Sequence, residues 1–141
     1  MNTEMQLRHQ REYRIRTENV CTKRYEKTIN GFLMRTYRNM KSRVCGIQWR
    51  KRHLYQGKEL LPKEVFYTWS KMNKDFLELY KHWKLKNYKR RICPSIDRVD
   101  SSKGYVLKNM RWITFSENCR QGALSKYSKI ANLKLVQIPR S

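Results

Sequence analysis

Apolar side chains recur at steps of three and four residues in the first half of the chain. Between Asn30 and Val44 this spacing describes one face of a helix, and Gly46 ends it. The pattern therefore predicts a helix that begins at Thr28 or Asn30 and ends at Val44. Its apolar face consists of Phe32, Leu33, Tyr37, Met40 and Val44.

Two further helices are predicted after residue 61. Pro62 suits the first position of a helix, and the chain breaks near Asn73 before a second helix starts at about Lys74. We expect their aromatic side chains in the core, because the short strands that follow need an apolar surface to pack against. The apolar positions are Val65, Phe66, Trp69, Phe76, Leu77, Tyr80 and Trp83.

Residues 47–61 have no helical period and predict a loop or a short strand pair with a turn at Gly57. Basic residues alternate here with Trp49, His53 and Tyr55. This mixture suits contacts with a nucleic-acid backbone plus stacking on bases or sugars. The alternative is that Trp49 and Tyr55 belong to the core, and the sequence leaves both interpretations open.

The last third of the chain changes to short β-forming runs. Residues 96–99 and 110–114 flank a turn-rich loop, and Thr114 is followed three residues later by Glu117, which is the spacing of a helix capping box. The order is strand, loop, strand, helix. Together with the helices upstream, it predicts a small, mostly helical α+β domain with a C-terminal hairpin-plus-helix element.

Three polar residues mark the junctions of this element. Asp97 lies on the first strand, Asn109 enters the second, and Asn118 lies in the first turn of the helix. In this topology a strand residue and a first-turn helix residue face each other across a small gap. Because carboxylate and amide oxygens are ligands for hard divalent cations, the arrangement suits Mg²⁺.

The runs Ile-Asp-Arg-Val-Asp, Gly-Tyr, Asn-Met-Arg-Trp-Ile-Thr and Ser-Glu-Asn resemble the HNH (ββα-metal) nuclease family, in particular its small phage and intron-homing type. The resemblance implies that Asp97 and Asn118 bind Mg²⁺ or Mn²⁺ and that Asn109 pins the connecting loop. The implied catalytic set is Asp97, Arg98, Asn109 and Asn118.

One position departs from that family. Arg98 follows the ligand Asp97, where the family has its general-base His, and Arg cannot be deprotonated to activate water. Arg98 would instead grip phosphate oxygens, or a substitute base would act. Substitutes are His53, His82, Asp100 and Tyr105. If the rest of the site is intact, Arg98→His is expected to raise activity.

The charge of the chain points to a polyanionic partner. Lys and Arg number 33 against 11 Asp and Glu, a net charge of +22, and double-stranded DNA is the expected partner. An anionic membrane surface is the second polyanion to consider, but no run of 18 apolar residues exists to span a bilayer, and no membrane partner is expected. The basic residues could simply form solvated faces of helices and loops. In the alternative interpretation they contact nucleic acid, and the expected contacts are Arg35, Arg38, Lys84, Lys86, Lys89, Arg90, Arg91 and Arg111.

The predicted organisation has four parts. These are a basic N-terminal arm at 1–27, a helical and basic nucleic-acid-binding region at 28–92, the HNH-like ββα motif at 93–125 and a C-terminal tail at 126–141. The arm is interpreted either as flexible or partly helical, or as a segment that orders on nucleic acid. Four cysteines without C-x-x-C spacing predict reduced thiols and a cytoplasmic protein, in the host cytoplasm if a phage encodes it.

These observations predict a metal-dependent HNH-like endonuclease or nicking enzyme acting on DNA, with an active site weakened at Arg98. One alternative is a non-catalytic protein on a degenerate HNH scaffold that binds DNA or structured RNA. A second alternative is a cationic inhibitor of a host factor. A positively charged surface suits all three functions, so the sequence leaves the choice among them open.

Overall fold

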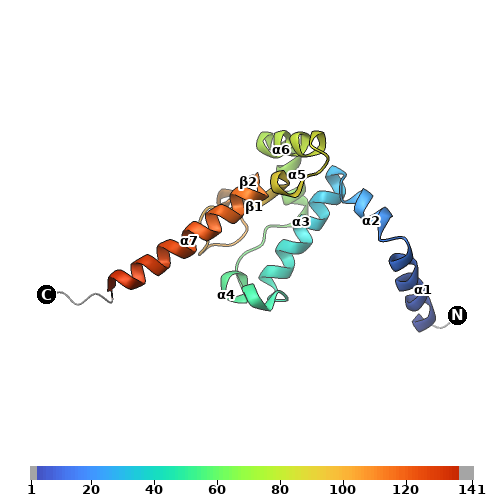
Figure 1. The fold of residues 1–141 in the computed structure, drawn as a ribbon, viewed down its shortest axis with the longest axis horizontal. Coiled ribbons are helices and arrows are strands. Elements are labelled where there is room, and N and C mark those ends of the chain that lie inside the picture. The colour runs from blue at the N-terminus through green and yellow to red at the C-terminus, as the bar shows by residue number, and fades with distance from the viewer. Residues whose placement is uncertain (1–2, 137–141) are drawn as a thin grey trace. The chain divides into compact units, whose positions relative to one another are not determined.

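The computed structural model describes residues 3–136, which fold into helices and one two-stranded sheet (Figure 1). The predicted α+β class is confirmed at this level. The chain divides into two compact units, Met1–Arg38 and Asn39–Ser141, and the division falls inside α3. The elements are α1 (Thr3–Arg16), α2 (Val20–Tyr25), α3 (Ile29–Val44), η1 (Trp49–Lys51), α4 (Arg52–Tyr55), α5 (Lys63–Met72), α6 (Lys74–Leu85), η2 (Arg90–Ile92), β1 (Pro94–Arg98), η3 (Leu107–Asn109), β2 (Met110–Thr114) and α7 (Phe115–Val136).

The first unit begins with two helices that bury no side chain. Glu18 and Asn19 turn the chain between them with positive φ angles of 51° and 57°. The Thr28 hydroxyl then accepts a hydrogen bond from an N–H in the first turn of α3, which is the ordinary role of Thr at a helix start. The arm predicted at 1–27 is thus helical over most of its described length.

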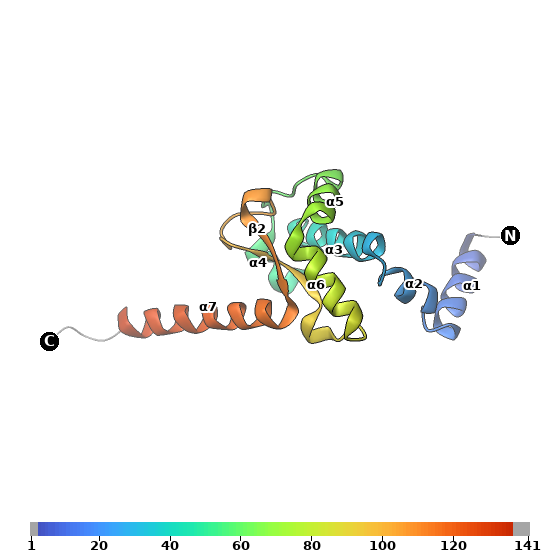
Figure 2. The ribbon, with the colours of Figure 1, turned by 90° about the horizontal axis from the view of Figure 1, so that it is seen from above.

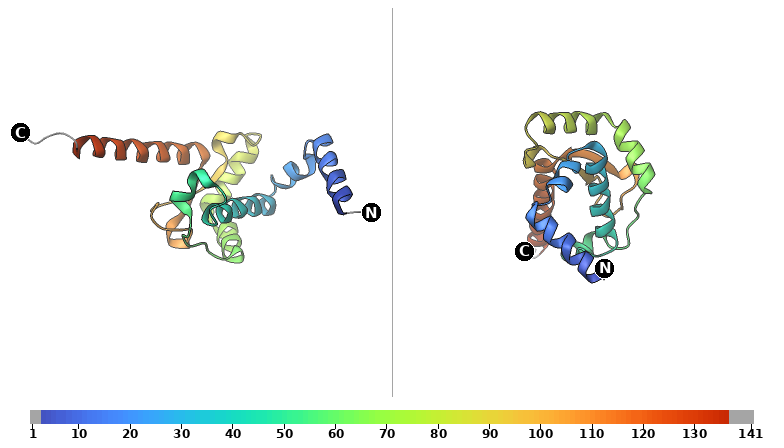
Figure 3. Two further views of the ribbon diagram at one scale, coloured as in Figure 1. Left: turned by 90° about the horizontal axis from the view of Figure 1, so that it is seen from below. Right: turned by 90° about the vertical axis from the view of Figure 1, so that its right-hand side faces the viewer.

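The second unit is built around the ring of Trp112 on β2. This ring lies 4.5 Å from that of Phe76 and 6.1 Å from that of Phe66, centroid to centroid, and it stacks on Trp69. Phe66 and Phe76 are fully buried. They come from α5 and α6, which run in clearly different directions (Figure 3). The predicted aromatic core is therefore confirmed, with Trp112 as the residue that joins it to the hairpin.

The hairpin of β1 and β2 is antiparallel, with Ile96 opposite Trp112 and Asp97 opposite Arg111. Because successive strand residues point to opposite faces, Ile96 and Trp112 share one face and Asp97 and Arg111 share the other. The first face meets α6 and the second meets α7, so the hairpin lies between these two helices (Figure 2).

Helix α7 begins where the capping residues predict. The Glu117 N–H donates to the Thr114 hydroxyl at 3.2 Å. The return bond of a capping box is replaced, because the Glu117 carboxylate accepts from Arg120 and Gln121 instead. The helix continues through the first part of the predicted tail to Val136, and its later turns extend beyond the other elements of the second unit (Figure 2).

Three details of the predicted secondary structure were wrong. The first strand was predicted at 96–99, whereas β1 runs from Pro94 to Arg98. Residues 47–61 form the short helices η1 and α4 rather than a strand pair, although Gly57 does turn the chain with a φ of 76°. Leu60 instead forms an isolated parallel bridge with Tyr105. Pro62 is the residue before α5 rather than its first position. A four-residue helix is too short to produce a hydrophobic period, so its pattern gives no signal.

Candidate functional site

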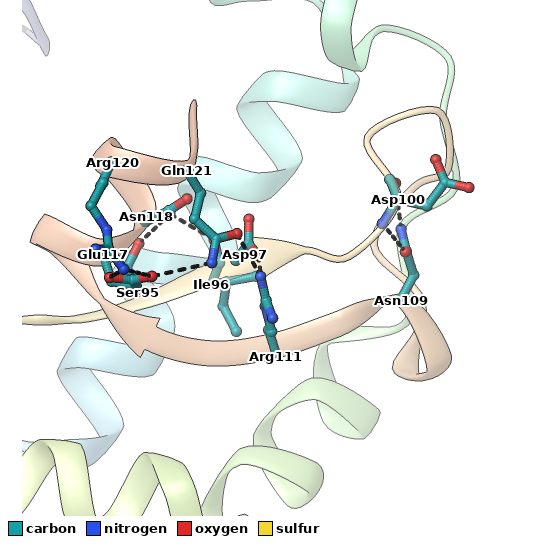
Figure 4. Close-up of polar contacts among 10 residues, drawn as sticks. All are labelled: Ser95, Ile96, Asp97, Asp100, Asn109, Arg111, Glu117, Asn118, Arg120 and Gln121. Carbon is teal, nitrogen blue, oxygen red and sulfur yellow. Dashed lines mark hydrogen bonds and ion pairs between the residues drawn. The ribbon is translucent and has the colours of Figure 1, made fainter. Parts of the chain in front are cut away.

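Asp97 lies on the face of the hairpin that meets α7. Its carboxylate is mostly covered, and Oδ2 accepts a hydrogen bond from Arg111 Nε at 2.8 Å across the two strands. Arg111 Nη2 also donates to the Gln121 side-chain oxygen at 2.6 Å. Figure 4 shows these three side chains meeting between the hairpin and the helix. Arg111 therefore connects both strands to α7.

Asn118 reaches the same point of the hairpin from α7. Its Nδ2 donates to Ser95 Oγ at 2.8 Å and to the Ile96 carbonyl at 3.2 Å. An amide nitrogen has two hydrogens, so both are used on the strand, and the amide oxygen is the atom that a ligand can take. The Ile96 carbonyl belongs to the peptide that joins Asp97, so Asn118 binds β1 directly before the predicted ligand Asp97.

A second charged pair borders this point on α7. Arg120 Nη2 lies 2.7 Å from Glu117 Oε2, and Gln121 donates to the same carboxylate. The hydrogen bond from Arg120, followed by that from Gln121, lowers the pKa of Glu117. The side chains of Asp97, Arg111, Gln121, Glu117 and Arg120 thus form one chain of polar contacts (Figure 4).

Asn109 organises the loop between the strands and lies away from that polar chain (Figure 4). Its buried amide makes three bonds to loop backbone: Oδ1 accepts from Asp100 N at 2.7 Å, and Nδ2 donates to the carbonyls of Asp100 and Gly104. The loop-pinning contacts implied for Asn109 are therefore present. Because both ends of the amide bind backbone, Asn109 acts on the site through the loop.

Arg98 has its side chain committed to the fold. Nη1 donates to the Leu54 carbonyl at 3.1 Å and to the Lys103 carbonyl at 3.0 Å, and the guanidinium lies 4.0 Å from the Tyr55 ring centroid. Strand alternation directs it to the Ile96 side of the hairpin. The structure does not bring the guanidinium of Arg98 together with Asp97 and Asn118.

The substitute bases proposed from sequence lie in different settings. His53 on α4 and His82 on α6 are both exposed. Asp100 caps its own turn, where bonds from the Ser102 hydroxyl and N–H lower its pKa. Tyr105 is buried against Arg43, and burial raises its pKa. The acidic and phenolic candidates in the hairpin loop are thus occupied by structural contacts.

Five of the basic residues predicted to contact nucleic acid follow one another around the end of α6 and through η2. All five are exposed, and the guanidinium of Arg90 lies 4.9 Å from the ring centroid of Phe115, the first residue of α7. The run therefore borders the helix end from which Asn118 projects. Its members are Lys84, Lys86, Lys89, Arg90 and Arg91.

The remaining three predicted contacts are separate from that run. Arg35 and Arg38 are exposed on the part of α3 that belongs to the first unit, where Arg35 pairs with Glu26 at 3.1 Å. Arg111 is engaged with Asp97. Sequence reasoning assigned Arg111 to nucleic acid and missed this pair, because the partner across a hairpin depends on the strand register.

Asp97 and Asn118 carry donor atoms of the kind that a divalent cation binds. One carboxylate and one amide oxygen form the small set of hard ligands that Mg²⁺ uses when water and a substrate phosphate complete its shell. Within residues 3–136, no group of three His, Cys, Asp or Glu side chains is placed to hold a metal. Any such site here therefore relies on the Asn118 oxygen and on the substrate.

Gln121 is the site residue that sequence reasoning did not single out. It follows Asn118 by three positions, so helical geometry places it on the same side of α7. That spacing was the available signal. Gln121 joins Arg111 to Glu117 and thereby orders the polar chain beside Asp97.

Comparisons with family models, with curated proteins and with solved structures give no match. No helix in the described part of the chain has both the length and the apolar character needed to cross a bilayer. The interpretation of the hairpin-plus-helix element therefore depends on the residues and contacts described above.

Proposed function

We propose that this protein is a divalent-metal-dependent phosphodiesterase that nicks or cleaves DNA, built on an HNH-type ββα element. The observation that carries the proposal is that Asn118 binds β1 at Ser95 and Ile96, directly before Asp97 in the chain. Both N–H groups of Asn118 are used on the strand, so its amide oxygen is the atom left for a ligand. A carboxylate and an amide oxygen are the kinds of ligand that the proposal needs.

In this proposal Asp97 supplies the negative charge of the site and Asn118 supplies a neutral oxygen from a fixed direction. A bound Mg²⁺ would stabilise the charge that grows on phosphorus and on the leaving 3′ oxygen. Asn109 fixes the loop between the strands and thereby keeps β1 and its Asp97 in a constant position. The exposed run from Lys84 to Arg91 neutralises phosphates on either side of the scissile bond.

Arg111 has a defined part in the same proposal. In the absence of DNA it neutralises the Asp97 carboxylate. A phosphate that enters the site offers the guanidinium a second anion, and a guanidinium binds two phosphate oxygens well. Arg111 then moves from the carboxylate to the phosphate, which frees Asp97 for the cation.

A second function is supported by two specific observations. Arg98 occupies the position of a general base and is bonded to loop carbonyls, and Arg111 already neutralises Asp97. Both favour a protein that binds nucleic acid through its basic surface and does not cleave it. The two functions share one DNA-binding surface and differ in metal-dependent chemistry.

Plasmid nicking in Mg²⁺ and in Mn²⁺, compared with EDTA, separates the two. The first function predicts conversion of supercoiled to open-circular DNA only with metal, and an Asp97→Ala variant that loses this activity at least about 100-fold, because the charged ligand is gone. Asp75→Ala removes an exposed carboxylate from α6 and serves as the matched control, which is expected to retain activity.

The outcomes are distinct. DNA binding without metal-dependent nicking, in a wild-type protein with normal thermal unfolding, supports the second function. Equal nicking by wild type and Asp97→Ala places the chemistry elsewhere and contradicts the proposed ligand pair. Thermal unfolding of each variant, followed by circular dichroism, identifies any loss of activity that comes from unfolding.

A further inference from the structure

Residues 46–57, here called the tip segment, present apolar side chains to solvent. Ile47 is 73% exposed and Trp49 is 70% exposed. They lie two positions apart beside the 3₁₀ turn η1. Large side chains at this exposure cost hydrophobic free energy in the free protein, and a pair of them at one place marks a contact surface.

The tip segment is held in shape by its own hydrogen bonds. Gly46 ends α3 with a φ of 75°, and Arg52 donates to its carbonyl through two nitrogens at 3.2 and 3.3 Å. The Gly57 N–H returns to the Val44 carbonyl at 3.1 Å. Hydrogen bonds thus fix the segment at both ends, and Trp49 lies on a preorganised turn.

The tip segment is also fastened to the hairpin that carries the candidate site. Arg98 and Lys58 both donate to the Leu54 carbonyl, and Lys58 further donates to the Ser101 carbonyl at 2.7 Å. Tyr55 stacks on Tyr105 at 6.0 Å between ring centroids. The tip therefore has a fixed place relative to the loop of the hairpin.

The charges around Trp49 identify the partner. Arg50 lies over the Trp49 ring at 5.5 Å, and Lys51, Arg52 and His53 follow at once. The sequence has no Asp or Glu between Glu26 and Glu59. Such a cationic surface around a single aromatic wedge suits a polyanion that has flat apolar groups inside it, which describes the base steps of nucleic acid.

We propose that Trp49, supported by Ile47, inserts against a base step of duplex DNA while the neighbouring basic side chains hold its phosphates. The proposal rests on the proposed function for the choice of DNA as partner, and it does not require cleavage. Sequence reasoning left Trp49 and Tyr55 equally suited to stacking and to the core; their surroundings separate them, with Trp49 exposed and Tyr55 packed on Tyr105.

The test measures binding of a short random-sequence DNA duplex in EDTA, at several salt concentrations, to the full-length protein. Trp49→Ala is expected to weaken binding roughly tenfold at every salt concentration, because stacking is lost and no phosphate contact changes. Lys51→Ala is expected to reduce the slope of log affinity against log salt concentration by about one, because one phosphate contact fewer releases about one counterion fewer. Tyr127→Ala removes another exposed aromatic, on α7, and is expected to leave binding unchanged.

Tryptophan emission gives a second readout. DNA is expected to quench the wild type, and Trp49→Phe is expected to lose most of this quenching while it retains most of the affinity. Wild-type affinity for Trp49→Ala, or quenching that survives in Trp49→Phe, overturns the proposal. Quenching of Trp49 by anionic phospholipid vesicles but not by DNA also overturns it and assigns the tip to lipid.

The Asp97→Ala protein separates this inference from the proposed function. In the Asp97→Ala background, Trp49→Ala is expected to weaken binding by the same factor as in the wild type, and DNA is expected to quench Trp49 in EDTA, because the tip acts without metal. Absence of nicking in wild type with an intact Trp49 response contradicts only the nuclease; nicking without a Trp49 response contradicts only the tip.

Discussion

The two faces of the β1–β2 hairpin share one backbone and are held in opposite ways. On one face Ile96 and Trp112 are buried, and Trp112 packs on the rings of α5 and α6. On the other face Asp97 and Arg111 meet α7 through hydrogen bonds between side chains. The first face is held by the packing of buried apolar side chains, and the second is held by directional hydrogen bonds and an ion pair.

This difference separates stability from chemistry. Burial of apolar area is non-directional and supplies most of the folding free energy. A partly exposed ion pair adds little, because water and salt screen it. The Trp112 face can therefore maintain the hairpin while the Asp97 face changes partners, which is what binding of a cation or a phosphate requires.

The largest expected effect comes from the apolar face. Trp112→Ala is expected to lower the free energy of unfolding by about 3–5 kcal/mol, because it leaves a cavity against Phe66 and Phe76. Urea unfolding followed by circular dichroism measures this. Tyr127→Ala, at an exposed position of α7, is the matched control. A loss below about 1 kcal/mol would show that the aromatic cluster is not the core.

An intermediate effect is expected at Arg98, at the loop end of the same strand. Arg98→Ala is expected to cost about 1–3 kcal/mol, because the carbonyls of Leu54 and Lys103 lose a charged donor and Tyr55 loses its cation. Exposed Arg91 provides the control variant Arg91→Ala. Unchanged unfolding of Arg98→Ala would contradict the structural role.

The structure also changes the expectation for Arg98→His. Strand alternation directs the side chain of residue 98 away from Asp97, so an imidazole there is not expected to activate water at the site. Nicking assays with Mg²⁺ test this. A tenfold gain, of the size typical of a working general base, would show that residue 98 reaches the attacking water.

The smallest effect on stability is expected on the polar face. Arg111→Gln is expected to change the free energy of unfolding by less than about 1 kcal/mol, because the Arg111 side chain is 43% exposed. Its effect on metal is expected to be larger: Mg²⁺ affinity, measured by calorimetry, rises because the cation that competes for Asp97 is gone. Arg120→Gln removes the neighbouring Arg of α7 and is the control. Unaltered Mg²⁺ affinity would contradict the ligand role of Asp97.

Sequence periodicity predicted the parts of the fold that depend on local pattern. The bounds of α3, the start of α6 and the bounds of the second strand agree with the prediction, and the Thr114 cap follows from residue type. Periodicity could not separate Trp49 from Tyr55, because both lie among the same basic residues. Tyr55 is covered because Tyr105, fifty positions later in the chain, stacks on it and the guanidinium groups of Arg43 and Arg98 lie over its ring.

For the candidate site too, the sequence identified individual residues but not the partners that they contact across the fold. Asn118 binds β1 at Ser95 and Ile96, next to Asp97, and the resemblance named Asp97, Asn109 and Asn118. It could not name the partners of Asp97 or Arg98, because those depend on strand register and on where residues 52–55 pack. The contacts of Arg98 with Leu54 and Tyr55 join segments that no local pattern connects.

Gly104 shows that the hairpin-plus-helix element is not structurally independent of the rest of the second unit. A Cβ at Gly104 would lie 2.3 Å from the Glu59 carbonyl oxygen, and the backbone bonds of Leu61 and Glu59 to Tyr105 hold the two segments together there. The loop that Asn109 closes is thus shaped against chain more than forty positions upstream. Moved into another scaffold, residues 93–125 would lose the backbone against which their loop packs, so the shape of this element depends on residues 59–61.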